Sequence, residues 1–377
     1  MKLKLKNTPE QVELIKAMGA KDQVEAAKAQ SAFAEFIGPV IQEVIKQAAT
    51  AGAIYTDSEF DEDDSPSYPL DLYYDQNAGH VTVWSQGIAG GLPTSHVEGL
   101  KEMKIATYRL DSAVSLHKRY ARRGRLDVVS KAVERMAQEV LVKQERNAWA
   151  VIMKALAEAS TKGGKASSAS GAKNHVIQST TGDVLQLDDF NRLMTLARRL
   201  NASFAEGTPV GSRGVTDLFM SPEMIEQIRG FAYQPMNTRA VPDTTESTAV
   251  PLPDSVREGA FRSAGMQEIY GVSIHELLEL GVGEKYNKLF AEFAQSTSYP
   301  SSGGSAFTQA SDEIVVGVDA SRDAFIRPVA RQAENGGSFV ALPDDQFVAR
   351  SEKLGFYGYL EEGRVCIDAR ATVGIIV

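Results

Sequence analysis

The sequence predicts a mixed α+β protein, because two kinds of hydrophobic periodicity occupy separate stretches of the chain. Apolar residues recur at helical spacing over residues 126–159, and a helix of that length would span roughly 50 Å at about 1.5 Å per residue. Over residues 353–377 apolar residues instead fall at every second position, which is typical of strands with one buried face. Because the apolar pattern continues to the last residue, we expect the closing strand to be paired within a sheet.

The N-terminal stretch 8–50 has the pattern of two or three short helices. Thr8-Pro9-Glu10-Gln11 has the form of a capping box with proline at the first helical position. Pro39 interrupts the apolar stripe further along. These helices have little core of their own, so we expect the stretch to pack against the body of the chain or against a neighbour.

A strongly acidic stretch, DSEFDEDD at 57–64, follows the helices. A calcium loop would need glycine at its sixth position and glutamate at its twelfth, where this chain has Glu62 and Tyr68. The sequence therefore predicts a solvated loop here and no calcium site.

A long β-hairpin with a glycine-rich tip is predicted next, from strand patterns over 68–84 and 103–118. Two strands alone are marginally stable in water, so we expect the hairpin to lie on another subunit. Its tip would be exposed in the free chain and covered by a neighbour in an assembly. The apolar residues concerned are Trp84, Ile88 and Leu92.

The rest of the chain alternates between short elements and loops rich in glycine, serine or proline. The expected loops are 160–182, 234–260 and 296–312. The expected elements are a helix over 187–200, a strand over 218–220 that leads into a helix from Pro222, a strand pair over 267–278 around Gly271, and a strand over 314–318.

Composition places the chain among ordinary globular proteins, with 43% hydrophobic and 24% charged residues in 377. The formal net charge of −9 argues against a general nucleic-acid binder, which normally has a basic face.

The single cysteine, Cys366, excludes a disulfide within the chain, and we expect it in the closing strand as a small core residue. No run of roughly 18 apolar residues occurs, and no apolar segment follows the basic N-terminus, so we expect a soluble intracellular protein without a membrane span.

No motif for catalysis, metal binding or cofactor binding is complete in the sequence, so we expect no catalytic site, no metal site and no cofactor site. The phosphate-loop-like stretch 160–167 has Ala159 where the first glycine should stand. His275-Glu276 would open a zinc-protease motif only with a second histidine at the position of Glu279. Carboxylates are numerous, and a catalytic acid pair stays open as an alternative because nothing singles one out.

The sharpest charge feature is a basic segment between the hairpin and the long helix. It admits three interpretations: nucleic-acid contact, a solvated face, or a subunit interface that matches an acidic surface such as 57–64. The acidic net charge disfavours nucleic acid, and opposite charges steer and register association, so we favour the interface. The residues of this basic segment are Lys118, Arg119, Arg122, Arg123 and Arg125.

The C-terminal stretch resembles the closing signature of tailed-phage major capsid proteins and of the related encapsulins. The resemblance rests on an aromatic-glycine segment followed by the pattern Asp368, Arg370, Ala371, Gly374 and Ile375. The order of the predicted elements resembles the same family from end to end. The segments that match best are 108–159, 218–229, 264–274 and 353–377.

The resemblance implies a capsid fold made of four parts. These are an N-terminal arm at 1–65, a long hairpin or E-loop at 66–112, a P domain at 113–182 and 322–365 with its spine helix at 126–159, and a central A domain at 183–321 and 366–377.

The resemblance also implies a structural, non-enzymatic function. The chain would self-assemble into hexamers and pentamers of an icosahedral shell that encloses phage double-stranded DNA without sequence-specific binding. Its partners would be copies of itself, a portal, a scaffold and cement or decoration proteins. It would be located in the virion after assembly in the host cytoplasm. The alternative is an encapsulin-like compartment around a protein cargo, and a more distant one is an enzyme with an unrecognised carboxylate site.

Overall fold

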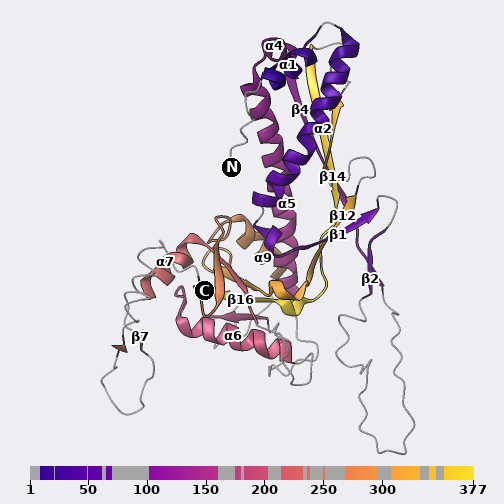
Figure 1. Ribbon diagram of the computed structural model, residues 1–377. Helices are drawn as coiled ribbons and strands as arrows, with labels where there is room; N and C mark the ends of the chain where they lie inside the picture. The colour runs from indigo at the N-terminus through magenta and orange to yellow at the C-terminus, as the bar shows by residue number, and fades with distance from the viewer. Residues whose placement is uncertain are drawn as a thin grey trace, which may run out of the picture. The chain divides into compact units, whose positions relative to one another are not determined.

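The structure is a computed structural model (Figure 1). It describes residues 9–20, 22–48, 50–61, 65–69, 102–159, 175–179, 182–202, 214–231, 236–237, 249–250, 268–294, 307–331, 339–344 and 352–377. The chain forms two compact units, each with a sheet and a hydrophobic core of its own. The first unit comprises residues 1–69, 101–148 and 325–365, and the second comprises 70–100, 149–324 and 366–377.

The first unit is built on the long strand β14 (Lys353–Glu362). It pairs in antiparallel fashion with β4 (Tyr108–His117) and with β13 (Phe339–Asp344). At its end it meets β12 (Phe325–Arg331), which pairs in parallel with β1 (Thr56–Asp61). The remaining elements of this unit are α1 (Pro9–Met18), α2 (Gln23–Ala48), η1 (Ala51–Ala53), β2 (Ser67–Pro69), β3 (Glu102–Lys104), α4 (Lys118–Arg122), the beginning of α5 (Leu126–Glu158), and the short strand β15 (Val365–Cys366), which begins here and pairs with β12.

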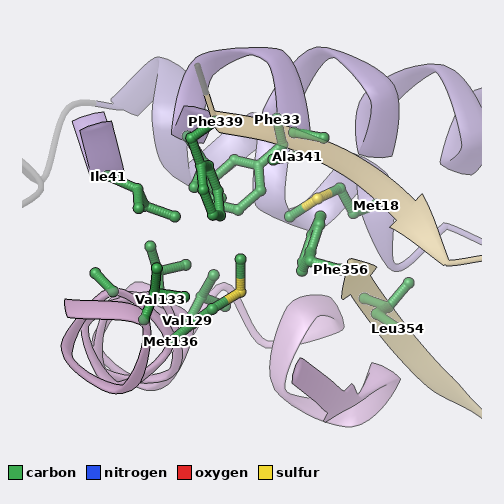
Figure 2. Close-up of a cluster of buried hydrophobic side chains, with 14 of the residues drawn as sticks. Met18, Phe33, Ile41, Val129, Val133, Met136, Phe339, Ala341, Leu354 and Phe356 are labelled. Atoms are coloured by element: carbon green, nitrogen blue, oxygen red, sulfur yellow. The ribbon is translucent and has the colours of Figure 1, made fainter. Parts of the chain in front are cut away.

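The core of the first unit lies between one face of this sheet and the helices α2 and α5 (Figure 2). Phe33 of α2 meets Phe356 of β14 with ring centroids 5.4 Å apart. Gly358 lies where Met136 of α5 and Phe339 of β13 leave no room for a side chain. The alternating burial along β14 follows from this arrangement, because only one face of the sheet is covered by helices.

The second unit contains a six-stranded sheet in the order β5-β16-β11-β6-β10-β9. Its strands are β5 (Val176–Gln178), β6 (Asp217–Met220), β9 (Glu268–Ile269), β10 (Val272–Glu276), β11 (Ile314–Val318) and β16 (Thr372–Ile376). Its other elements are the end of α5, α6 (Leu187–Ala202), α7 (Pro222–Phe231), β7 (Met236–Asn237), β8 (Ala249–Val250), α9 (Lys285–Ala294), η2 (Ala320–Arg322) and η4 (Ala369–Ala371).

Both faces of the second sheet are covered, and this explains the composition of its central strands. One face packs against α6 and α7, and on the other Phe219 meets the buried ring of Trp149 from α5, which stacks on Tyr286 of α9. Every residue of β11 and of β16 is buried. Strands buried on both faces form continuous apolar runs, so the closing strand does not have the single buried face that the alternating pattern predicts.

Most of the elements predicted from periodicity are confirmed. The long helix ends at Glu158, within one residue of its expected end, and the helix at 187–202 and the strand pair around Gly271 lie where expected.

Pro39 does not end a helix: the helix α2 continues through it, from Gln23 to Ala48. The hairpin stem is present as antiparallel pairing between β2 and β3, whereas its tip, including Trp84, Ile88 and Leu92, lies outside the described residues.

Two predictions for acidic and C-terminal residues are wrong. Of the acidic stretch predicted as a loop, residues 57–61 belong to the strand β1, where arginines of β12 pair with Asp57 and Glu59, and residues 62–64 lie outside the described residues. The C-terminal stretch divides between two sheets, with β14 in the first and β16 in the second. Cys366 lies in the short strand β15 of the first sheet and not in the closing strand; the residue as a whole is partly exposed, whereas its thiol is buried, which raises the pKa of the thiol.

Candidate functional site

The basic segment forms a compact, outward-facing turn of the first unit. Its short helix α4 ends at Gly124, which has a φ of +63° that glycine adopts without strain. Ala121 is 2% exposed and anchors the turn in the core beneath it. Around this anchor, Arg119, Arg122, Arg123 and Arg125 are exposed and Lys118 is half-buried.

Helix α1 supports the basic segment from the side (Figure 1). Arg122 donates from Nε to the carbonyl oxygen of Gly19 at 3.0 Å, and a Cβ on Gly19 would lie 2.7 Å from the backbone nitrogen of Arg122. Lys16 of α1 lies against Gly124. Arg122 is therefore partly a structural residue, and Lys16 adds a sixth cation that the sequence pattern did not reveal.

The charge of the basic segment is largely uncompensated within the described residues. Arg125 approaches Asp127 at 3.7 Å, but both side chains are more than half exposed, and such a pair contributes little. For Arg119 and Arg123 the described part of the chain contains no carboxylate partner. Arg119 and Arg123 are therefore the candidates within the segment for contact with another acidic surface.

Strand β1 is not the free acidic surface that was predicted to match the basic segment, because two of its carboxylates already pair with arginines of the chain. Arg327 binds Asp57 through two hydrogen bonds of 2.6 and 2.5 Å, and Arg331 approaches Glu59 at 3.4 Å. A bidentate arginine–carboxylate pair is among the stronger ion pairs. Two of the six carboxylates that were expected to match the basic segment are therefore paired within the chain, and residues 62–64 lie outside the described residues.

A buried ionic network that sequence analysis missed lies at the end of β14. The Glu362 side chain is fully buried, and its two oxygens accept hydrogen bonds from Tyr108 at 2.8 Å and from Gln144 at 3.0 Å. Arg364 lies 3.3 Å and Arg327 3.9 Å from the same carboxylate. Burial, reinforced by Glu362, raises the pKa of Tyr108 to about 12, so the phenol stays a hydrogen-bond donor.

This network lies at the root of the hairpin stem. The amide of Gly363, the residue after Glu362, donates to the carbonyl oxygen of Pro328 at 2.8 Å. A side chain on Gly363 would collide with Ile105, whose amide in turn donates to the carbonyl oxygen of Pro66 at 3.0 Å. The buried charges therefore lie beside the place where the chain leaves the first sheet for the hairpin.

The prediction that catalytic groups are absent covers the whole chain, whereas the structure describes only part of its residues. Within the described ranges no group of three or more His, Cys, Asp or Glu side chains has a metal-binding arrangement. His275 pairs with Asp217 at 2.9 Å, away from the zinc-protease pattern. No described helix combines the length and apolar character that a membrane span needs.

Comparison with known proteins identifies the fold through structure alone. No protein-family model and no curated protein sequence matches the chain. The capsid structure of the cyanophage P-SCSP1u matches with a TM-score of 0.50 and 12% identity, over 85% of this chain and 86% of that one. The chain has the phage capsid fold. The α+β capsid architecture that the sequence predicted is thus confirmed at the level of the fold.

Two further solved structures match the chain with lower TM-scores. The capsid of an empty GTA particle has a TM-score of 0.46 and 12% identity, over 87% of this chain and 89% of that one. The SrpI encapsulin of Synechococcus elongatus PCC 7942 has a TM-score of 0.35 and 10% identity, over 73% of this chain and 75% of that one.

Proposed function

We propose that this chain is a major capsid subunit that self-assembles into hexamers and pentamers of an icosahedral shell around phage double-stranded DNA. The observation that supports the proposal is the capsid fold, shared over 85% of the chain with a phage capsid structure. The subunit carries no catalytic site in this proposal and acts as a structural component of the virion.

The physical chemistry of the chain fits such a role. A closed shell repeats the same interfaces many times by symmetry, so contacts that are modest singly add up to a stable particle. A subunit with a formal net charge of −9 also limits adhesion of packaged DNA to the wall. Assembly would take place in the host cytoplasm, with a portal, a scaffold and cement or decoration proteins as further partners.

The division into parts belongs to the same proposal. We assign an N-terminal arm to 1–65 and an E-loop to 66–112. The P domain takes 113–182 and 322–365, and the A domain takes 183–321 and 366–377. Intersubunit contacts are assigned to the basic segment and to Trp84, Ile88 and Leu92 of the hairpin tip.

Particle size and content test the proposed function directly. The full chain, expressed with and without the neighbouring genes of its source, should form megadalton particles by light scattering and hollow shells by negative-stain microscopy. Particles filled with double-stranded DNA support the capsid, and particles filled with one host enzyme support the encapsulin-like alternative. A stable monomer or dimer with turnover on a substrate would refute a shell of either kind.

The hairpin tip should be protected from hydrogen exchange only in assembled particles. Two strands bury too little apolar surface to offset their ordering entropy, so a neighbour must cover Trp84, Ile88 and Leu92. Exchange over residues 80–105 is compared in dissociated subunits and in particles, with β11 as an internal reference that is buried within its own unit. Equal and strong protection in both states would mean that the hairpin folds on its own subunit.

A further inference from the structure

Glu313, at the beginning of β11, is a buried carboxyl whose position is fixed by its backbone. The residue is 3% exposed, and its amide and carbonyl groups both pair with Val377 at 2.9 Å. The buried Asn287 of α9 holds the adjacent peptides, since it donates to the carbonyl oxygen of Asp312 at 2.8 Å and accepts from the amide of Ile314 at 3.3 Å. The backbone of Glu313 is therefore held at the end of the β11–β16 pairing, with its side chain buried.

The polar environment of the Glu313 carboxyl is incomplete. The buried Ser221 forms a hydrogen bond with the Glu313 carboxyl. The Oγ of Ser221 also accepts a hydrogen bond from the amide of Met224 and so caps α7. The other oxygen, Oε1, has no hydrogen-bond partner. In the described part of the chain no basic side chain pairs with Glu313. An ionised carboxylate in such a place is costly, because it is buried and no cation among the described residues compensates its charge.

A second carboxylate, Glu223, borders the same glycine as the unpartnered oxygen and acts on Glu313 through its charge. Glu313 Oε1 and Glu223 Oε2 lie 3.9 and 3.5 Å from the position that a Cβ on Gly281 would occupy, and Glu284 borders the same place. Gly281 has a φ of +138°, which other residues rarely adopt, so the space stays free of a side chain. Glu223 is exposed in the first turn of α7, where water and the helix end stabilise its charge, and Glu313 has neither advantage.

We propose that Glu313, Glu223 and Ser221 form a proton-binding clamp that joins β11, the start of α7 and the turn around Gly281. When protonated, Glu313 keeps its hydrogen bond with Ser221 and no longer repels the Glu223 carboxylate, and all three elements are held together. When ionised, it repels Glu223 and loosens the same junction. Burial raises the pKa of Glu313 and the neighbouring Glu223 adds to this, while the Ser221 hydrogen bond offsets part of it.

The sign of the pH dependence follows from the raised pKa. The folded state holds a proton on Glu313 at pH values where the unfolded chain has lost it, so this group stabilises the second unit in acid and ceases to do so as pH rises. His175 acts in the opposite direction, because burial lowers the pKa of its imidazole and the unfolded chain takes up the proton first. A comparison of variants that all retain His175 cancels that contribution.

The test compares the unassembled full chain with its Glu313→Gln and Glu223→Gln variants by hydrogen exchange between pH 5 and 8, corrected for intrinsic rates. The amides followed lie in β11, α7 and residues 277–284. Glutamine mimics a permanently protonated Glu313, so this variant should match the natural chain in acid and be better protected at neutral pH. The gain should be about tenfold for each unit by which the Glu313 pKa is raised. Glu223→Gln should show a smaller gain of the same sign.

Glu226→Gln on the same helix is the matched control, because Glu226 is exposed and should show no pH-dependent difference. A Glu313→Gln variant that is equally or less protected at neutral pH would overturn the proposal. So would protection of the natural chain that rises with added calcium or magnesium and not with acid, since the site would then bind a cation. Because the readout is local and uses unassembled chain, the outcome does not depend on whether the chain builds a shell.

Discussion

Replacing Glu362 with alanine is expected to lower the free energy of unfolding of the first unit by about 3–5 kcal/mol. The carboxylate is fully buried, and its removal leaves Arg364, whose side chain is 5% exposed, without its counter-charge. Arg327, 15% exposed, loses part of its compensation, and the donors of Tyr108 and Gln144 lose their acceptor. Breaking a buried ion pair from one side costs more than the intact pair contributes, because the remaining charge is stranded.

Denaturant unfolding of the unassembled chain measures this loss, and hydrogen exchange in β4 and β14 assigns it to the first unit. Glu59→Ala is the matched control, since Glu59 also faces an arginine at 3.4 Å but is 69% exposed. That exposed pair should cost less than about 1 kcal/mol. A loss of similar size for both variants would mean that the Glu362 network is not structurally important.

Glu362→Gln separates charge from hydrogen bonding at the same position. Glutamine keeps an acceptor for Tyr108 but offers no charge to Arg364, so its stability should fall between the natural chain and the alanine variant. The hairpin root should respond as well, because Gly363 and Ile105 pack together beside this network. We therefore expect faster exchange of the Ile105 amide in both variants.

The elements that the sequence predicts well are those whose periodicity is long and undisturbed. The helix that begins at Leu126 is specified by its own apolar stripe, and β11 by a short run of buried apolar residues. Strand β1 could not be predicted in this way, because two of its three carboxylates pair with arginines about 270 positions later in the chain. The sequence around β1 cannot indicate a partner so far away in the chain.

The two buried carboxylates, Glu362 and Glu313, differ in how well the local sequence pattern predicts their burial. The alternation of Leu354, Phe356, Gly358 and Leu360 on the covered face places Glu362 on that face as well, so the period of two could have identified it. Glu313 has no comparable pattern, since it precedes a strand that is buried on both faces. Its surroundings come from α7, α9 and the C-terminal strand, which only tertiary folding brings together.

Reversing the charges of Arg119 and Arg123 together, each to glutamate, is expected to prevent particle formation while leaving the subunit folded. Both side chains are exposed and have no carboxylate partner among the described residues, so their replacement breaks no ion pair within that part of the chain. Against an acidic neighbouring surface the new glutamates would place like charges together, which costs several kcal/mol at an interface. Arg122 is left unchanged because it holds Gly19 through its Nε.

Salt distinguishes this electrostatic effect from a steric one. The Debye length falls from about 8 Å at 0.15 M to about 3 Å at 1 M ionic strength, so high salt should restore part of the assembly of the double variant. Lys131→Glu with Arg135→Glu on α5 is the matched control, because it also reverses two exposed cations one helical turn apart. Light scattering then follows all three proteins at equal concentration. Normal yield of the Arg119 and Arg123 variant, or equal loss in the control, would show that the basic segment is a solvated face and that only net charge matters.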